Sequence, residues 1–360
     1  MSGGRGGAGA ADNQAGVKKV AGRVERAKTI IDVAARAGVS HQTVSRVLND
    51  HPAVAPATRS RVLDAMRALD YRPNAAARHL AGRRGHTVGV LVYGAMYFGP
   101  TQMLGSVEGA ARARGYSVTV IFVHDLTAQG IEEGVRALRA GRADGIIMIT
   151  PLHGVETLRL GELLDGVPYV LVDAEPTPQR AVVAIDQFAG GRAAAQHIAG
   201  LGHRAVAVLR GPDAWYDATL RHQGTLSVLT AGRLPTPLIL SGDWSAASGY
   251  RAVRRALEDP ASFSALIAAN DQMALGAIRA LQEAGRRVPQ DVSVIGFDDL
   301  PEAAYFQPPL TTIAQDFRAL GAASLERLVE LIETPQANPP STVLVPTLVV
   351  RESTAAPRKK

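Results

Sequence analysis

The chain has 360 residues, of which 46% are hydrophobic, and a formal net charge of +6 at pH 7. At about 150 residues per domain, this length predicts two or three globular units. No apolar run approaches the ~18 residues of a membrane span, and the Gly/Ala-rich N-terminus lacks the apolar core of a signal peptide, so we expect a cytoplasmic protein without a membrane partner. The absence of cysteine excludes disulfides, thiolate metal sites and cysteine nucleophiles.

The positive charge is concentrated near the N-terminus. Between Lys28 and Arg84 the sequence has ten Lys or Arg against four Asp, a difference of +6, so the rest of the chain is close to neutral. A small basic unit joined to a larger neutral one predicts a head that binds a polyanion and a body with a different task. On charge alone, a solvated basic surface is the alternative.

The first 27 residues are rich in glycine and alanine and have few large apolar side chains, which predicts a disordered tail over 1–27. A helical pattern then begins. Thr29 and Asp32 predict a capping box, and Gly38 predicts the end of the first helix. The tight turn after Gly38 leads to Ser40, which is expected to cap a second helix.

The second helix extends to about Leu48, and a third begins near Pro56 and is expected to bury Val62, Leu63, Met66 and Leu69. Three short helices predict one small domain over residues 28–73. Asn74 can cap one further segment up to Leu80, which is too short to be a stable isolated helix and leads into a linker that ends near residue 85.

The remaining chain alternates short β-branched runs with helical stretches. This alternation predicts an α/β fold of parallel sheets with helices on both faces, and its length favours two doubly wound lobes over one open sheet. The predicted strands are Thr87–Tyr93, Ser117–Phe122, Gly145–Ile149, Tyr169–Leu171, Ala205–Leu209, Leu238–Leu240, Ala265–Ala268 and Val292–Phe297.

Two short helices joined by a three-residue turn at Gly38 are typical of a helix-turn-helix, whose second helix enters the DNA major groove. His41, Gln42 and Arg46 lie outside the apolar stripe of this helix and suit hydrogen bonds to base edges. The alternative is that these three side chains form only the solvated face of a short helix. Phosphate contacts are expected from Thr29, Ser45, Asn49 and the arginines of the third helix.

The stretch from Ile31 to Asn49, IDVAARAGVSHQTVSRVLN, closely resembles the signature of the Lac repressor family of bacterial transcription regulators. The stretch from Tyr71 to Gly82 resembles the family's hinge. The resemblance implies a hinge helix within residues 74–85 that folds on operator DNA, with Leu80 inserted into the minor groove. An apolar wedge kinks DNA and gains contact area, although packing between domains is the alternative for Leu80. The expected DNA-binding residues are Thr29, Ser40, His41, Gln42, Thr43, Ser45, Arg46, Asn49, Asn74 and Leu80.

The resemblance continues to about Glu352 through four segments of the body, namely Gly242–Ala246, Ala269–Ala277, Pro308–Ile313 and Gln315–Phe317. It implies a periplasmic-binding-protein-like body over residues 86–352, with a ligand cleft between two lobes. The first lobe is expected at about 86–185 and 317–344, the second at about 186–316 and 345–352, and a tail at 353–360.

Polar side chains follow several predicted strands of the body. Asp173 follows one strand, Asn270 and Asp271 follow another, and Asp298 with Asp299 follows a third. Ligands of doubly wound sheets bind at the carboxyl ends of strands, and such groups suit the hydroxyls of a polyol better than an anion. Helix capping is the alternative for Asn270 and Asp271.

The resemblance favours Asp173, Arg221, Asn270 and Asp298 as hydroxyl partners and Trp244 and Phe317 as apolar walls, with Tyr93 as a further candidate. A surface ion pair is the alternative for Arg221, and ordinary core packing is the alternative for Trp244.

Two positions depart from the member after which the family is named. His41 replaces a tyrosine of the recognition helix, which puts the operator base preference in doubt. Ile149 replaces an asparagine of the cleft, which puts a galactoside ligand in doubt. The chain ends at Lys360 without a leucine-heptad helix, so we expect a homodimer and not a tetramer.

Together these features predict a repressor of carbohydrate-utilisation genes that binds a pseudo-palindromic double-stranded operator and is released by a sugar-like inducer. The alternatives are a sugar-binding transport receptor and a corepressor-dependent regulator. An enzyme with Asp173 and Asp298 as acid and base is not favoured, because the sequence has no phosphate-cradling Gly-rich loop, no HExxH and no G-x-S-x-G motif. We expect no cofactor and no metal site.

Overall fold

The computed structural model describes residues 28–48, 51–71, 86–124, 127–150, 160–164, 166–176, 180–258, 263–334 and 340–358. Contacts divide the chain into two units, one up to Arg83 and the other from Arg84 onward. The predicted tail 1–27 lies outside the described residues, as do Asn49 and the whole of the predicted hinge segment 74–85, which includes Asn74 and Leu80. None of the described helices is long and apolar enough to cross a membrane.

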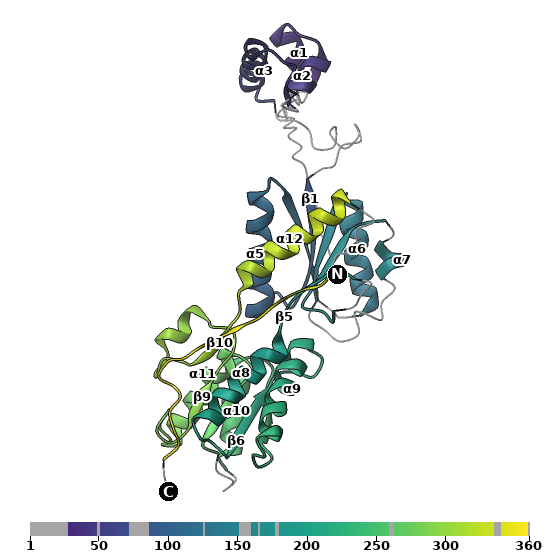
Figure 1. The fold of residues 1–360 in the computed structure, drawn as a ribbon. Coiled ribbons are helices and arrows are strands. Elements are labelled where there is room, and N and C mark those ends of the chain that lie inside the picture. The colour runs from purple at the N-terminus through teal and green to yellow at the C-terminus, as the bar shows by residue number, and fades with distance from the viewer. Residues whose placement is uncertain are drawn as a thin grey trace, which may run out of the picture. The chain divides into compact units, whose positions relative to one another are not determined.

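The described part of the N-terminal unit contains three helices, α1 Ile30–Ala37, α2 His41–Leu48 and α3 Pro56–Ala68 (Figure 1). The predicted capping box is confirmed, since the Thr29 N–H donates to Asp32 Oδ2 at 2.7 Å and the Asp32 N–H donates to Thr29 Oγ1. Gly38 ends α1 in the left-handed conformation at φ +63°. A glycine favours this conformation because it has no Cβ to clash with the backbone.

A small apolar core joins the three helices. Val33 of α1, Val44 of α2 and Val62 of α3 are fully buried in it. The prediction that Leu63 is buried is wrong, because its side chain is 43% exposed. On α3 the inward face belongs to Val62 and Ala65, which are three residues apart and therefore share one side of the helix.

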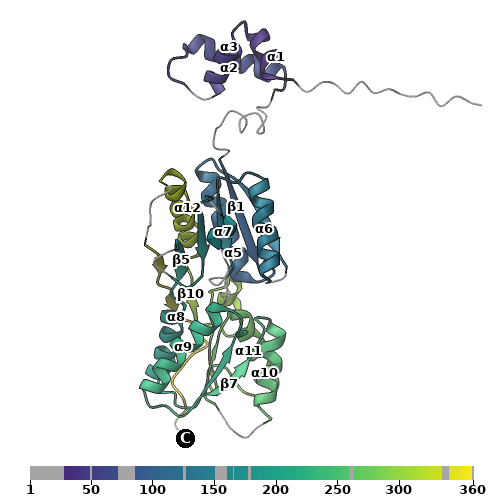
Figure 2. The same cartoon turned by 90° about the vertical axis from the view of Figure 1, so that its right-hand side faces the viewer.

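The first lobe of the body is a six-stranded parallel sheet in the order β11-β5-β4-β3-β1-β2. Its strands are β1 Thr87–Tyr93, β2 Ser117–Val123, β3 Gly145–Ile149, β4 Tyr169–Val172, β5 Val182–Ile185 and β11 Thr342–Leu344. Along β1, Val88, Val90 and Val92 pack with α5 Phe98–Ala113 and α12 Phe317–Glu333. Leu91 faces the other side, where α6 Ala128–Ala140 and α7 Leu160–Leu164 lie (Figures 1 and 2). Burial on both faces explains the nearly continuous apolar runs of these strands.

The second lobe repeats this plan on a four-stranded parallel sheet in the order β7-β6-β8-β9 (Figure 2). Its strands are β6 Val206–Arg210, β7 Leu238–Ser241, β8 Ala265–Ala268 and β9 Ser293–Ile295. One face packs against α8 Gln187–Gly200 and α9 Tyr216–Ala231, and the other packs against α10 Ala246–Ala256 and α11 Asp271–Glu283. A short 3-10 helix, η2, spans Pro301–Tyr305. The expected two-lobed, doubly wound α/β body is therefore confirmed.

The chain passes between the lobes three times: after β5, between β10 Thr312–Ala314 and α12, and between β11 and β12 Thr347–Val349. β10 and β12 pair antiparallel as a separate two-stranded sheet. The sequence did not predict β5, β10, β11 or β12. Each has only three or four residues, so no period could identify it, although β8 and β9 are as short and were predicted from their apolar runs.

The segment 353–358, expected as a tail, instead packs against the second lobe. Ser353 is fully buried, and its Oγ accepts from the Thr311 N–H at 2.8 Å. His203 Nε2 lies 2.8 Å from the Ala355 carbonyl oxygen. The expectation of a free tail from 353 is wrong for this segment, because buried side chains of the lobe satisfy its polar groups.

Helices α8 and α9 approach so closely that glycine is required between them. A Cβ on Gly191 of α8 would lie 2.1 Å from the Arg221 carbonyl oxygen of α9, whereas a Cβ on Gly200 of the same helix would meet nothing within 4 Å. We expect Gly191→Ala to lower the free energy of unfolding by about 1–3 kcal/mol through overpacking. Gly200→Ala is the control and is expected to raise it by about 0.5–1 kcal/mol.

Urea unfolding followed by tryptophan fluorescence checks this prediction, because the chain has two tryptophans and both Trp215 and Trp244 lie in the second lobe. Equal stability of the two variants would show that the α8–α9 contact tolerates a methyl group.

Candidate functional site

Helix α2 of the N-terminal unit, the predicted recognition helix, presents a polar surface. His41, Gln42 and Arg46 are exposed, while Val44 and Val47 of the same helix are buried. The predicted base-contacting side chains are therefore free to meet a ligand, on a helix anchored by its valines.

The hydroxyl side chains at the helix starts already have partners within the unit. Thr29 Oγ1 donates to Asp32 Oδ2 at 2.9 Å. Ser40 Oγ accepts from the Thr43 N–H at 3.1 Å and lies 3.0 Å from Thr43 Oγ1. These groups fix the starts of α1 and α2. Ser45 is half-buried on α2.

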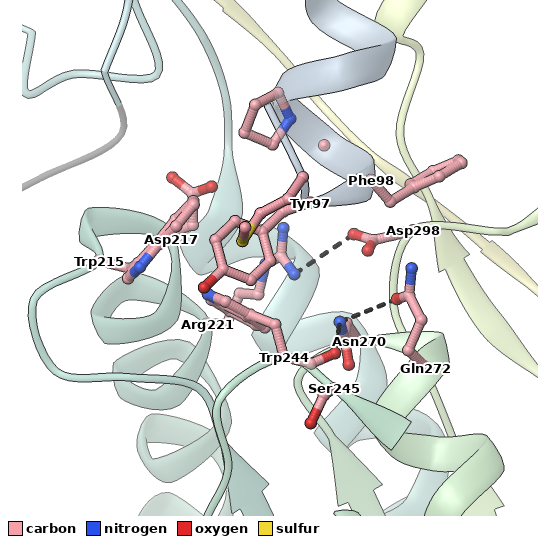
Figure 3. A pocket seen from close by; sticks show the side chains of 13 residues that line it. Tyr97, Phe98, Trp215, Asp217, Arg221, Trp244, Ser245, Asn270, Gln272 and Asp298 are labelled. Atoms are coloured by element: carbon pink, nitrogen blue, oxygen red, sulfur yellow. Dashed lines mark hydrogen bonds and ion pairs between the residues drawn. The ribbon is translucent and has the colours of Figure 1, made fainter. Parts of the chain in front are cut away.

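The body contains a cavity of about 330 Å³, a size typical of small-molecule sites. The first lobe supplies its lining from the start of α5, and the second lobe supplies the remainder, including most of the polar groups (Figure 3). The lining residues are Met96, Tyr97, Phe98, Gly99, Pro100, Trp215, Asp217, Arg221, Trp244, Ser245, Asn270, Gln272 and Asp298.

Arg221 lies at the centre of the polar part of this site. Its Nη1 donates to the Ala269 carbonyl oxygen at 2.6 Å and lies 3.3 Å from Asp298 Oδ1. Its guanidinium carbon also lies 3.8 Å from the centre of the Phe297 ring. These contacts fix the fork of Arg221 in one orientation, which suits directional hydrogen bonding to a ligand.

Two glutamines hold the Arg221–Asp298 pair in place. Arg221 Nε donates to Gln187 Oε1 at 2.9 Å, Gln187 Nε2 donates to Gln315 Oε1 at 3.0 Å, and Gln315 Nε2 donates to Asp298 Oδ1 at 2.7 Å. All four side chains are buried. A continuous hydrogen-bonded network thus supports Arg221 and Asp298 in the cavity wall.

The buried carboxyls of this region resist ionisation. Burial raises the pKa of Asp298 to about 6, against the opposing effect of Arg221. Burial likewise raises the pKa of Asp173 to about 6, although the Ile185 N–H and the Arg221 charge act in the other direction. A ligand that donates hydrogen bonds would stabilise the ionised form of either group.

Asp217 lies on α9 one helical turn before Arg221. Its side chain lines the cavity, and its Oδ1 is buried without a hydrogen-bond partner. Burial and then the neighbouring charge of Asp173 raise the pKa of Asp217 well above its usual range. Buried polar atoms are ordinarily paired, so this oxygen lacks a donor that such atoms usually have.

Three residues of the site occupy positive-φ backbone conformations, namely Asp173 at 51°, Trp244 at 74° and Asp298 at 109°. Such conformations are strained for residues other than glycine and occur often at binding sites. For Trp244, the Asn270 side chain helps to hold the backbone, because Asn270 Nδ2 donates to the Trp244 carbonyl oxygen at 3.0 Å.

The structure brings Arg221, Trp244, Asn270 and Asp298 together around one cavity. Asn270 is also the N-cap of α11, so the capping alternative describes it correctly as well. Asp173 is buried beside the network and does not line the cavity, although its Oδ2 has no hydrogen-bond partner.

Two predicted residues of the site lie behind the cavity wall. Tyr93 packs against Trp215 at 5.9 Å between ring centres, and Phe317 packs edge-on against Phe98 at 5.9 Å. Ile149 is fully buried in the core under α5 and α12 and does not line the cavity. Ile149 therefore contributes no side chain to this cavity.

Several lining residues had not been predicted, chiefly Tyr97, Trp215, Asp217, Ser245 and Gln272. The four-residue spacing from Asp217 to Arg221 places both side chains on one face of α9, and this spacing could have identified Asp217 as a lining residue.

Asp271 does not line the cavity. It accepts from the Leu300 N–H at 2.8 Å and from Thr312 Oγ1 at 2.6 Å, so it is structural. The described residues contain no His, Cys, Asp or Glu group suited to a metal ion.

Comparisons with known proteins match both units. Residues 29–74 match the family model of bacterial regulatory proteins of the lacI family, and residues 195–354 match that of a periplasmic binding protein-like domain. The lactose operon repressor of Escherichia coli (strain K12) is 37% identical over 330 residues, which cover 91% of each chain. The HTH-type transcriptional regulator CelR of Thermobifida fusca is 37% identical over 91% of this chain and 98% of its own.

Solved structures give the same result. A Lac repressor dimer bound to operator and the anti-inducer ONPF superposes with a TM-score of 0.85 at 37% identity, covering 91% of this chain and 99% of that one. A complex of the transcriptional regulator CelR with cellobiose gives a TM-score of 0.68 at 33% identity, covering 91% of this chain and 99% of that one.

Proposed function

This chain belongs to the lacI family of bacterial regulatory proteins, and on that premise we propose that it is a homodimeric repressor whose operator affinity is lowered by a sugar-like effector. In this proposal residues 28–73 contact the operator, 74–85 form the hinge, and 86–352 bind the effector. The protein acts in the cytoplasm on genes of carbohydrate use.

The cavity around Arg221 is the observation that supports a polyol effector. Carboxylates, an amide and a guanidinium lie beside the rings of Trp215 and Trp244, whose centres are 5.7 Å apart. Polar groups that bond hydroxyls and rings that cover C–H faces together suit a sugar. One similar structure, that of CelR, holds cellobiose, which agrees with this chemistry.

The proposed coupling is a shift between two states of the body. An effector that contacts both lobes stabilises one relative position of the lobes and thereby changes the spacing of the two hinges in a dimer. A coupling free energy of about 1–3 kcal/mol, roughly 5–150-fold in affinity, releases the operator because short hinge helices are marginal alone.

The direct test selects an operator from random duplex DNA with the purified protein and then titrates the complex with mono- and disaccharides. We expect at least one sugar to weaken operator binding within the range above. A sugar that tightens operator binding would contradict induction and support the corepressor alternative, while failure to select any duplex would contradict the repressor assignment itself.

Arg46→Ala separates the two activities. It removes an exposed base-contacting side chain, so we expect specific operator affinity to fall roughly 5–150-fold, which corresponds to about 1–3 kcal/mol. Sugar binding measured by thermal shift should be unchanged. Arg136→Ala is the matched control, because this exposed arginine of α6 pairs only locally with Glu132 at 2.8 Å. If both variants bind the operator alike, α2 does not recognise bases through Arg46.

A further inference from the structure

The described lining of the cavity has more acidic than basic side chains. Among the described residues that line it, Asp217 and Asp298 are the acids and Arg221 is the one cation. Arg221 is committed to Asp298 at 3.3 Å and to neutral partners, namely Gln187 and the Ala269 carbonyl oxygen. Asp217 therefore forms no ion pair with the described lining residues, and the charge of Arg221 offsets only part of the effect of burial on the pKa of Asp217.

Asp217 also lacks the donor that a buried acceptor ordinarily has. Its side chain lines the cavity but is only 6% exposed, and its buried Oδ1 has no hydrogen-bond partner. An unsatisfied acceptor oxygen in the cavity wall suits a donor that carries positive charge, because a buried carboxylate without an ion-pair partner is strongly disfavoured.

The aromatic residues beside Asp217 fit the same ligand chemistry. Trp215, two residues before Asp217, lies edge-on to Tyr97 at 5.1 Å between ring centres and edge-on to Trp244 at 5.7 Å. Figure 3 shows Trp215 and Asp217 side by side at one end of the cavity, with Asp298 and Gln272 at the other. Rings next to a carboxylate attract an ammonium group through the negative charge of their faces.

We propose that the effector is an amino sugar or a related aminopolyol, whose protonated amine pairs with Asp217 while its hydroxyls bond the Arg221–Asp298 network. The inference rests on the proposed function, since it names the chemical class of the same effector. The arriving ammonium stabilises the ionised carboxylate of Asp217, which the cavity alone disfavours.

The test compares each amino sugar with its neutral counterparts by calorimetry on the full chain. The probes are D-glucosamine and D-galactosamine, their parent sugars D-glucose and D-galactose, and their N-acetyl derivatives. A charge-assisted bond in a buried site leads us to expect roughly 10–100-fold tighter binding of the amines than of either neutral form. Equal or weaker binding of both amines, or no binding by any probe, overturns the inference.

Asp217→Asn keeps the size and hydrogen-bonding capacity of the side chain and removes its charge. We expect it to abolish the preference for the amine, so that each amino sugar and its parent sugar bind the variant with similar affinity. Asp213→Asn is the control, because Asp213 is exposed near the start of the same helix, pairs with Arg210 and does not line the cavity. A preference that survives in Asp217→Asn overturns the assignment to Asp217.

Operator binding distinguishes this inference from the proposed function. If neutral sugars release the operator and amino sugars do not, the repressor assignment holds and the amine inference fails. If Asp217→Asn is too unstable to purify, the comparison of amine with N-acetyl derivative on the unaltered chain still decides the question.

Discussion

Replacing Arg221 with methionine is expected to abolish the response to the effector and to lower the free energy of unfolding by about 3–5 kcal/mol. Removal of the guanidinium leaves Asp298 buried with only Gln315 as a partner, and the carbonyl oxygen of Ala269 loses its donor. Operator binding should persist, because the helices that contact DNA belong to the other unit.

A second substitution, Arg221→Lys, separates the effect of the positive charge from that of the hydrogen-bonding geometry. Lysine keeps the positive charge but cannot reproduce the fork that reaches Gln187, Ala269 and Asp298 together. We therefore expect most of the stability to return while the effector response stays impaired. Operator binding with and without sugar, together with urea unfolding, measures both effects.

Arg210→Met is the matched control for the arginine substitutions. Arg210 ends β6 in the same lobe, is paired with the exposed Asp213 and does not line the cavity. It should leave the effector response unchanged. A normal response in Arg221→Met, or an equal loss in Arg210→Met, would remove Arg221 from the site.

Asp271→Asn is expected to stabilise the protein increasingly as pH rises from about 4 to about 8. Asp271 is fully buried, and burial, followed by the charge of Asp298, raises its pKa from the ordinary 3.8 to about 8. Between these values the unfolded state releases the proton and the folded state retains it, so the stability of the natural protein falls as pH rises.

Asparagine removes this pH dependence without losing the contacts. Its amide can donate to Thr312 Oγ1 and its oxygen can accept from the Leu300 N–H, the two groups that Asp271 now holds. The stability difference between variant and natural protein should therefore grow by up to about 1.4 kcal/mol per pH unit and level off above pH 8, reaching a few kcal/mol.

Urea unfolding at several pH values from 5 to 9 measures this difference. Asp291→Asn is the control, because its hydrogen bonds with Arg287 lower the pKa of Asp291 to about 2 and keep it ionised in both states over this range. Its effect on stability should be independent of pH. A constant difference for Asp271→Asn would show that Asp271 is ionised in the folded protein.

Local sequence signals determined the three described helices of the N-terminal unit. The capping pair Thr29 and Asp32, the left-handed Gly38 and the apolar spacing of α2 are effects within one or two helical turns, so the residues involved are also neighbours in sequence. The longer strands of the body were predicted for a related reason, since burial on both faces makes each one a continuous apolar run.

The sequence also indicated part of the cavity. Arg221, Asn270 and Asp298 were predicted because two of them follow strands and all agree with the family resemblance. Asp298 and Asn270 share one edge of the second sheet, which the rule for doubly wound folds anticipates.

Only the tertiary structure decided the rest. β5, β10, β11 and β12 are defined by their pairing, β11 with β5, β5 with β4, and β10 with β12. Asp217 and Asp271 look alike in sequence, as single acids in the first turn of a helix. The fold places one against an open cavity with an unpartnered oxygen and closes the other around Leu300 and Thr312. Whether a buried carboxyl binds a ligand or stabilises the core depends on which remote groups reach it, and those groups are brought together only by the packing of the whole lobe.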